Sequence, residues 1–304
     1  MTRPPLSITD RARGCLLGLA AGNSLGLPTE FLGTPEAIRE KFPQGLRDVL
    51  RQDTPDSPYD DDLALAVIQA EELLEAEFDM ERLVSRWVDW RRRDGRGIGL
   101  WTAKALDHIA LHHSPPSDTG GAAGNGSIPR TIPVALATAA TPANLVSGSY
   151  HLAYLLHPDP RCAWGAVAVN VALACLLQGR RDFIPEVLEA LSANSAPDEL
   201  LAAVRRVPLE KKEALPIVGP EAGYVVHCVE IGLWFAHHEP KLERGLIWLA
   251  NAGGDTDSNA AVAGALMGAR DGEGAIPDRW VKEIVGVEHL RELADALVGA
   301  SGTT

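Results

Sequence analysis

The sequence predicts an all-α fold, a single compact domain of helices packed in an orthogonal multi-helix arrangement. Three observations predict it. Apolar residues recur at i, i+3 and i+4 through most of the chain, no segment alternates apolar and polar residues as a strand does, and no Pro-, Gly- or Ser-rich linker separates two regions of different composition. With 304 residues, 46% of them hydrophobic, the chain can bury a large core. We therefore expect one domain over 1–304, frayed at about 1–7 and 299–304.

The helical pattern occurs in twelve segments. In chain order they are 9–26, 62–79, 80–94, 97–113, 130–141, 162–178, 183–193, 197–206, 222–238, 241–251, 258–269 and 278–298. Small residues dominate two of them, in GCLLGLAAG (14–22) and AAVAGALMGA (260–269), and small side chains let helix axes approach closely. Heptad repeats are absent, which disfavours a coiled coil. The longest irregular stretch, 113–133, has the length of a functional or disordered loop.

Composition excludes several classes of protein. The formal net charge of −13 disfavours strong binding to a nucleic-acid backbone, because such binders carry a basic face. The four cysteines lie in apolar stretches without C-x-x-C pairing, which is typical of buried thiols in a reducing compartment. The first residues contain no apolar signal core, and no uncharged apolar run reaches about 18 residues. We expect a cytoplasmic protein that does not bind membranes, and we favour a monomer.

Two acidic clusters each precede a strongly apolar helix. The first is Asp60-Asp61-Asp62, and the second lies in Gly253-Gly254-Asp255-Thr256-Asp257-Ser258. Helix capping explains one Asp at each place. Three consecutive Asp exceed that need, and no Lys or Arg occurs from Gln52 through Met80 or from Gly245 through Ala269. Either a distant Arg or a hard divalent cation then balances the charge, and carboxylates with a hydroxyl suit Mg²⁺ or Mn²⁺.

Spacing suggests how such cations are held. Asp255 and Ser258 are three residues apart and share a face of the first helical turn, whereas Asp257 projects differently and can reach a second ion. Two ions about 4 Å apart require roughly this number of oxygens. The candidate metal ligands are Asp60, Asp61, Asp62, Asp255, Asp257 and Ser258.

The two clusters resemble the metal motifs of the ADP-ribosylglycohydrolase family. This all-α family includes the enzyme that reverses ADP-ribosylation of dinitrogenase reductase and the mammalian ADP-ribosyl-acceptor hydrolases. Its second motif, Gly-Gly-Asp-Thr-Asp-Thr before Ala-Ala-x-x-Gly-Ala, is matched closely by residues 253–258. Its first motif, Thr-Asp-Asp-Thr, is matched with two departures, because Asp60 and Leu63 stand at the two Thr positions. Asp60 keeps an oxygen ligand and adds charge.

Further segments resemble the family in the same order along the chain. GLAAGNSLGLPTEF (18–31) resembles its Gly-Asp-x-Leu-Gly-x-Pro-x-Glu motif, which places Glu30 on the motif Glu and Asn23 where an Asp is usual. Residues 124–130 resemble its Gly-Asn-Gly loop, His157 begins a His-Pro-Asp-Pro motif, and Tyr224 follows a Gly at a helix start. Residues 274–280 match the motif before the last helix, which we assign to packing.

The resemblance implies roles for these residues, beside which structural alternatives stay open. Backbone amides of the glycine-rich loop would contact a diphosphate, His157 a phosphate or ribose, and Tyr224 the adenine. In structural terms, the loop is an ordinary turn, His157 only begins a helix, and Tyr224 belongs to the core. Arg130 either binds phosphate or neutralises the acidic clusters. The expected ligand-binding residues are Gly124, Asn125, Gly126, Ser127, His157 and Tyr224.

The resemblance implies a hydrolase that cleaves the glycosidic bond between ADP-ribose and an acceptor, with two Mg²⁺ or Mn²⁺ ions as cofactors. Glu30, Asp61 and Asp257 would be its catalytic residues. The alternatives are a non-catalytic ADP-ribose-binding or structural protein of the same fold, and a phosphohydrolase using the same metals. The acceptor stays open among arginine, serine, a nucleobase and small molecules, and we expect it near loops 40–58 and 113–123.

Overall fold

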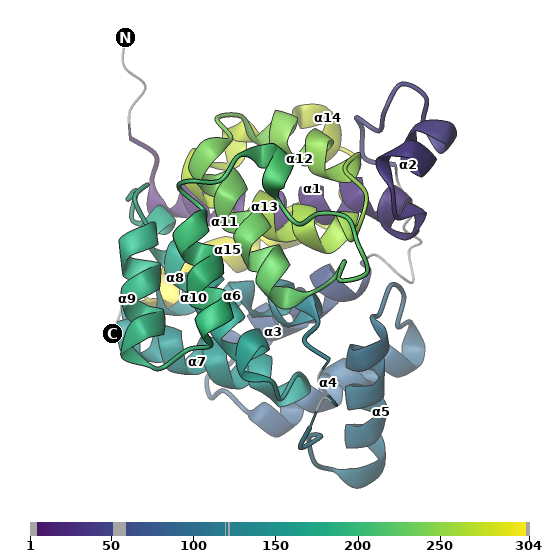
Figure 1. Ribbon diagram of the computed structural model, residues 1–304. Coiled ribbons are helices and arrows are strands. Elements are labelled where there is room, and N and C mark those ends of the chain that lie inside the picture. The colour runs from purple at the N-terminus through teal and green to yellow at the C-terminus, as the bar shows by residue number, and fades with distance from the viewer. Residues whose placement is uncertain (1–4, 51–58, 119, 121, 302–304) are drawn as a thin grey trace.

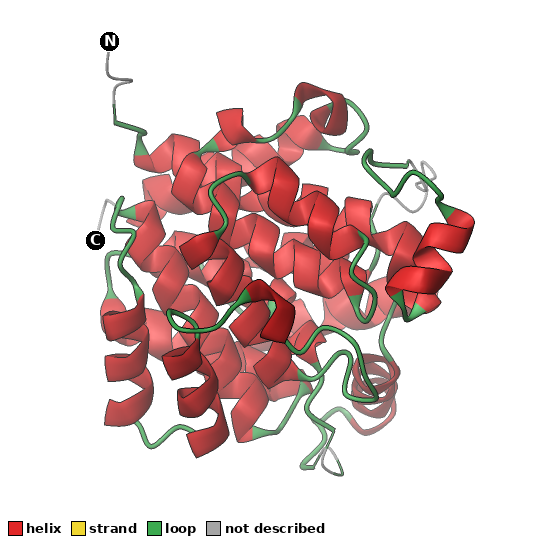
Figure 2. Cartoon of the chain, turned by 45° about the horizontal axis from the view of Figure 1, so that its top comes forward, coloured by secondary structure: helices red, strands yellow, loops and turns green. Residues whose placement is uncertain are grey.

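The computed structural model describes residues 5–50, 59–118, 120 and 122–301, and within them the chain forms helices, loops and two isolated bridges (Figures 1 and 2). The α-helices are α1 (Ile8–Gly26), α2 (Pro35–Lys41), α3 (Asp61–Leu73), α4 (Met80–Arg93), α5 (Leu100–His112), α6 (Ile132–Thr138), α7 (Pro142–Leu156), α8 (Pro160–Leu177), α9 (Ile184–Ala193), α10 (Asp198–Arg206), α11 (Val225–His238), α12 (Leu242–Ala250), α13 (Thr256–Asp271), α14 (Asp278–Val281) and α15 (Val287–Ser301). Short 3₁₀ helices are η1 (Leu27–Leu32), η2 (Asn125–Ser127), η3 (Pro129–Thr131), η4 (Lys212–Ala214) and η5 (Glu273–Ala275). The prediction of an all-α fold is confirmed.

Each predicted segment overlaps an observed helix, but the predicted boundaries and two omissions need correction. The predicted helix 278–298 is two helices, because Gly286 has a φ of 68° and ends the pattern between α14 and α15. The prediction missed α2, which has seven residues, and α7, where Ser and Gly interrupt the apolar pattern. Helix α3 ends at Leu73 instead of 79, and α15 continues through Ser301, beyond the predicted start of the frayed tail.

The centre of the molecule is an antiparallel pair of helices, α1 and α13, with very close backbones. A Cβ added at Gly18 would lie 2.1 Å from the carbonyl oxygen of Gly264, and one added at Gly22 would lie 1.9 Å from that of Ala260. The same holds for Gly14 against Gly268. Only glycine permits such an approach, so the small-residue segments noted in the sequence form this contact. It places the end of α1 beside the start of α13 (Figure 1).

The remaining helices surround this pair. Helix α11 packs on α13, α15 packs on α1, and α8 contacts α7, α9 and α11. Helix α8 is long and apolar enough to cross a bilayer, but 83% of that window is buried inside the protein, as in a core helix. Helices α4 and α5 lie at one edge (Figure 1), where the indole nitrogen of Trp87 donates to the carbonyl of Leu65 in α3 at 3.2 Å. This contact anchors α3, whose first turn carries the first acidic cluster.

Candidate active site

Acidic side chains from three segments meet where α1, α3 and α13 converge. Asp60 is the N-cap residue of α3, and Asp61 and Asp62 lie in its first turn. Asp255 is the N-cap residue of α13, with Asp257 in its first turn. A Cβ at Gly26, the last residue of α1, would lie 2.5 Å from the Cα of Asp257, so the following η1 brings Glu30 to the same place.

Hydrogen bonds connect the acidic cluster to its surroundings. The Asn23 amide nitrogen donates to Asp60 Oδ1 at 2.6 Å, which joins α1 to α3. Ser258, in the first turn of α13, lies close enough to Asp62 of α3 to favour its charged form. The Asn125 amide nitrogen donates to Asp255 Oδ2 at 3.0 Å. These contacts link four of the predicted metal ligands, Asp60, Asp62, Asp255 and Ser258, to neighbouring segments.

Capping accounts for only part of this cluster. Asp255 accepts from the backbone amide of Ser258 at 3.3 Å and so caps α13, whereas Asp60 occupies the N-cap position of α3 without a side-chain capping bond. Arg130, whose charge is felt by Asp61 and Asp62, is fully buried and donates to the carbonyls of Gly126 and Ala153. Among the described residues, no ion-pair partner is found for Glu30, Asp61, Asp62, Asp255 or Asp257.

Burial and mutual repulsion disfavour the charged forms of these carboxyls. Desolvation, followed by the charges of Asp255 and Asp61, raises the pKa of Glu30 to about 8. Desolvation and the Asp60 charge raise the pKa of Asp61 to about 7. The pKa values of Asp62 and Asp257 are raised for the same reasons, first burial and then neighbouring carboxylates. Without a positive partner, the cluster therefore binds protons near neutral pH.

These shifts predict how stability depends on pH when divalent cations are removed. A carboxyl with a raised pKa in the folded state keeps its proton after the unfolded chain has lost it, so rising pH favours unfolding. The window runs from the ordinary pKa near 4 to about 7 for Asp61 and about 8 for Glu30. In EDTA, we expect the Tm to fall by roughly 5 °C or more between about pH 5 and about pH 8. Thermal melts measure this, and an unchanged or rising Tm would contradict it.

The oxygen atoms of the cluster suit a hard divalent cation. Within the described part of the chain, Glu30 Oε2, Asp62 Oδ2 and Asp257 Oδ1 are buried and have no hydrogen-bond partner. Anionic oxygen donors of this kind are what Mg²⁺ and Mn²⁺ prefer. In the same residues, no three His, Cys, Asp or Glu side chains converge closely enough to form a metal site as they stand.

The predicted phosphate loop, residues 124–127, lies beside the acidic cluster. The Asn125 backbone amide donates to the carbonyl of Gly223 at 2.9 Å, within a bridge between Gly124 and Tyr224. The Asn125 side chain faces Asp255, as described above. Ser127 is fully buried and donates to the carbonyl of Gly124 at 3.0 Å, inside the loop. The structure therefore brings the loop, Tyr224 and the second acidic cluster together.

His157 and Arg130 lie beneath the loop. His157 is 2% exposed, and its Nε2 would lie 3.4 Å from a Cβ on Gly124. Its Nδ1 accepts from Arg130 at 3.2 Å. Burial and the Arg130 charge lower the pKa of His157 well below its ordinary value, so the ring is neutral. Arg130 also holds the carbonyl of Gly126 at 2.5 Å, so both side chains support the loop from below.

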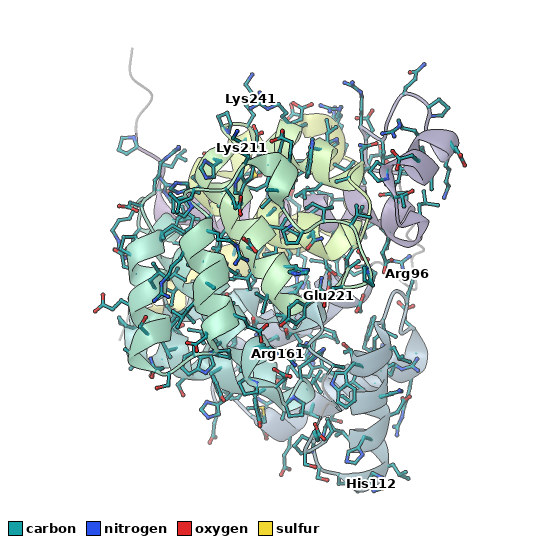
Figure 3. All side chains as sticks on the ribbon, in the orientation of Figure 1. Arg96, His112, Arg161, Lys211, Glu221 and Lys241 are labelled. Carbon is teal, nitrogen blue, oxygen red and sulfur yellow. The ribbon has the colours of Figure 1, made fainter. Side chains whose placement is uncertain are left out.

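Tyr224 lines a cavity of about 880 Å³ that opens beside the loop. Its hydroxyl donates to Glu199 at 2.5 Å, and the Arg161 guanidinium lies 5.6 Å from the centre of its ring. Arg161 and Glu221 also line this cavity and lie on the same side of the molecule (Figure 3). The volume suits a small-molecule ligand. Sequence reasoning missed Arg161, although it directly follows the His-Pro-Asp-Pro motif.

Comparison with known proteins agrees with this architecture. Residues 4–304 match the family model described as ADP-ribosylglycohydrolase. The chain is 30% identical to the ADP-ribosyl-[dinitrogen reductase] glycohydrolase of Rhodospirillum rubrum, over 99% of each chain. It is 28% identical to an ADP-ribosylarginine hydrolase of Pseudomonas putida, over 97% of this chain and 80% of that one.

A solved structure is also similar. It is titled an ADP-ribosylglycohydrolase-related protein complex and superposes with a TM-score of 0.76 at 27% identity, covering 97% of this chain and 99% of that one. The resemblance inferred from the acidic clusters is thereby confirmed at the level of family and fold. An all-helical fold matched over its length, with sequence similarity to hydrolases of ADP-ribose linkages, leads to one conclusion: this chain belongs to the ADP-ribosylglycohydrolase family.

Proposed function

We propose that this protein hydrolyses the glycosidic bond between ADP-ribose and an acceptor, with two Mg²⁺ or Mn²⁺ ions held by the acidic cluster. The observation that carries the proposal is the meeting of Glu30 and five Asp side chains, four of the Asp buried, where α1, α3 and α13 converge. Among the described residues, Glu30, Asp61, Asp62, Asp255 and Asp257 have no ion-pair partner. The names of the two relatives from Rhodospirillum rubrum and Pseudomonas putida, both hydrolases of ADP-ribose linkages, support the reaction. The proposed metal ligands are those predicted from the sequence.

The cluster suits this chemistry. When bound, the cations supply Lewis acidity, which polarises oxygen at neutral pH. Glu30 is half-buried, so its carboxyl can reach a ligand and hold or release a proton at the ribose. Asp61 and Asp257 place negative charge where the ribose ring becomes positive in an oxocarbenium-like transition state. The loop at 124–127 and Arg161 supply the amides and the guanidinium that hold a diphosphate beside the cluster.

The whole chain takes part in this function. We propose that it acts as one domain, because the family match extends over residues 4–304. We also propose a cytoplasmic location, which the four free and buried cysteines support.

The test is release of ADP-ribose from ADP-ribosyl-arginine, with added Mg²⁺ or Mn²⁺ and with EDTA. We expect turnover with a cation and a fall of at least about a hundredfold in EDTA, restored by excess cation. Binding of ADP-ribose without turnover of any ADP-ribosylated acceptor would favour a non-catalytic protein instead. Release of AMP or phosphate in place of intact ADP-ribose would indicate a phosphohydrolase.

A further inference from the structure

A second cavity, of about 620 Å³, lies on the other side of the Gly253-Gly254 turn from the loop at 124–127. Its lining comes from α2, the following loop, α12 and the two residues after α12. The residues that matter here are Pro35, Arg39, Arg47, Arg244, Trp248 and Asn251.

The position of the cavity follows from the packing of the turn. Gly253 and Gly254 have φ values of 82° and 69°, which favour glycine. A Cβ on Gly253 would lie 3.0 Å from Pro35, whereas a Cβ on Gly254 would lie 2.0 Å from the carbonyl of Ile217. The turn is therefore held between the α2 side and the segment that leads to Tyr224. Asp255 follows the turn directly, so the cavity is adjacent to the acidic cluster.

The cavity wall is held by specific hydrogen bonds. The Asn251 side chain accepts from the backbone amide of Leu46 at 2.8 Å and donates to the carbonyl of Leu46 at 2.8 Å. It also donates to the carbonyl of Ile247, in α12, at 2.7 Å. These bonds hold the loop after α2 against the end of α12 and form the wall before any ligand arrives.

The cavity is basic in a protein that is acidic as a whole. Arg39, Arg47 and Arg244 line it, and no acidic residue is among its described lining residues. Arg39 pairs with Glu36, and since both side chains are exposed, solvent weakens this pair. Arg244 pairs with Glu239, which is buried. Arg47 is exposed, and we find no ion-pair partner for it in the described ranges. Three guanidinium groups therefore line one cavity, where their charge attracts an anion.

We propose that this cavity binds an acidic peptide segment of an ADP-ribosylated protein, next to the modified residue. This inference rests on the proposed function. If the diphosphate binds at the loop at 124–127, the acceptor protein extends from the acidic cluster in the opposite direction. It then lies on the other side of the Gly253-Gly254 turn, where the arginines line the cavity. The arginines bind carboxylates, while Pro35 and Trp248 accept an apolar side chain between them. A long nucleic acid fits less well, because the net charge of −13 repels an extended polyanion.

The first experiment measures binding alone. A fluorescently labelled peptide with three Asp or Glu around an arginine, not ADP-ribosylated, is titrated with the full-length protein in EDTA and followed by anisotropy. We expect Arg39→Ala/Arg47→Ala to raise its Kd by about tenfold or more, and Arg205→Ala, an exposed arginine on α10, to leave it unchanged. Equal binding by the wild type and the double variant would overturn the inference, as would tighter binding of a neutral peptide or a single-stranded oligonucleotide.

A charge-reversal variant provides a second measurement. Arg47→Glu is expected to weaken binding of the acidic peptide and to strengthen binding of a matched peptide with Lys in place of Asp and Glu. Because Arg47 is exposed, the Tm of each variant should stay near that of the wild type. The same loss of affinity for both peptides would contradict recognition by charge.

Turnover separates this inference from the proposed function. Each enzyme is assayed with an ADP-ribosylated acidic peptide and with free ADP-ribosyl-arginine. The ratio of kcat/KM for the peptide to kcat/KM for ADP-ribosyl-arginine should be about tenfold lower in the double variant than in the wild type. If no ADP-ribosylated substrate is hydrolysed but the arginine variants lose affinity for the acidic peptide, the proposed function fails and the peptide site stands. If both substrates are hydrolysed and the ratio does not change, the peptide site fails and the proposed function stands.

Discussion

Asp257→Asn is expected to lower kcat for ADP-ribose release by about a thousandfold or more while the protein stays folded. Asp257 is 4% exposed, lies in the first turn of α13, and interacts electrostatically with Asp255, Glu30 and Asp62. An amide has nearly the same shape as the carboxyl but lacks the charge that a cation requires. The loss should therefore appear in kcat and in cation affinity, measured by turnover and by calorimetric titration with Mn²⁺.

The stability of this variant tests the same assignment independently of activity. Burial and neighbouring carboxylates raise the pKa of Asp257, so its charged form is unfavourable in the metal-free protein. Removing that group should leave the Tm in EDTA at about pH 8 unchanged or raise it. Asp198→Asn, at the first turn of α10 and exposed, is the matched control and should change neither turnover nor cation affinity. Full activity of Asp257→Asn would remove this residue from the proposed site.

Gly22→Ala is expected to destabilise the fold by about 3 kcal/mol, the upper part of the range for overpacked cores. The new Cβ would lie 1.9 Å from the carbonyl oxygen of Ala260, so α1 and α13 must separate. An ordinary helical Gly→Ala change instead stabilises by up to about 1 kcal/mol. Urea denaturation measures the change in the free energy of unfolding. In thermal melts, we expect a Tm lower by roughly 5 °C or more.

The matched control for Gly22→Ala is Gly299→Ala. Gly299 is also helical, near the end of α15, but no atom lies within 4 Å of its added Cβ. We expect that variant to be as stable as the wild type or slightly more so. Since separation of α1 and α13 also moves Glu30 away from Asp257, Gly22→Ala should weaken cation binding too. Wild-type stability of Gly22→Ala would show that the two helices do not need the close contact.

Much of the fold could be predicted because its helices carry a local signal. The apolar period identifies α1, α8, α11 and α13, because that period is a property of residues within a few turns of one another. The pattern failed at α7, where Ser147 and Gly148 interrupt it and packing against α8 compensates. It also failed at Gly286, where a positive φ ends the helical run. Such effects depend on neighbours distant in sequence.

The candidate site could be predicted in part for a similar reason. The two acidic clusters carry an unbalanced local charge that can be seen without coordinates, and family resemblance supplied Glu30. The interactions of Asn23, Arg130 and Arg161 could not be predicted. Asn23 bonds Asp60 across 37 positions of sequence, and Arg130 turns away from the carboxylates to support the loop. Nothing in their local sequence indicates those partners.

By itself, the amino-acid sequence determined that this chain is helical, which family it belongs to, and that its Asp side chains need a positive partner. Only the tertiary structure decided which acidic groups lie together, because glycine contacts between α1 and α13 bring Glu30 to Asp257. It also placed three arginines on the far side of the Gly253-Gly254 turn. The physical reason is range. Helical periodicity and charge repulsion between adjacent residues act over a few positions, whereas burial and electrostatic fields depend on every segment that packs nearby.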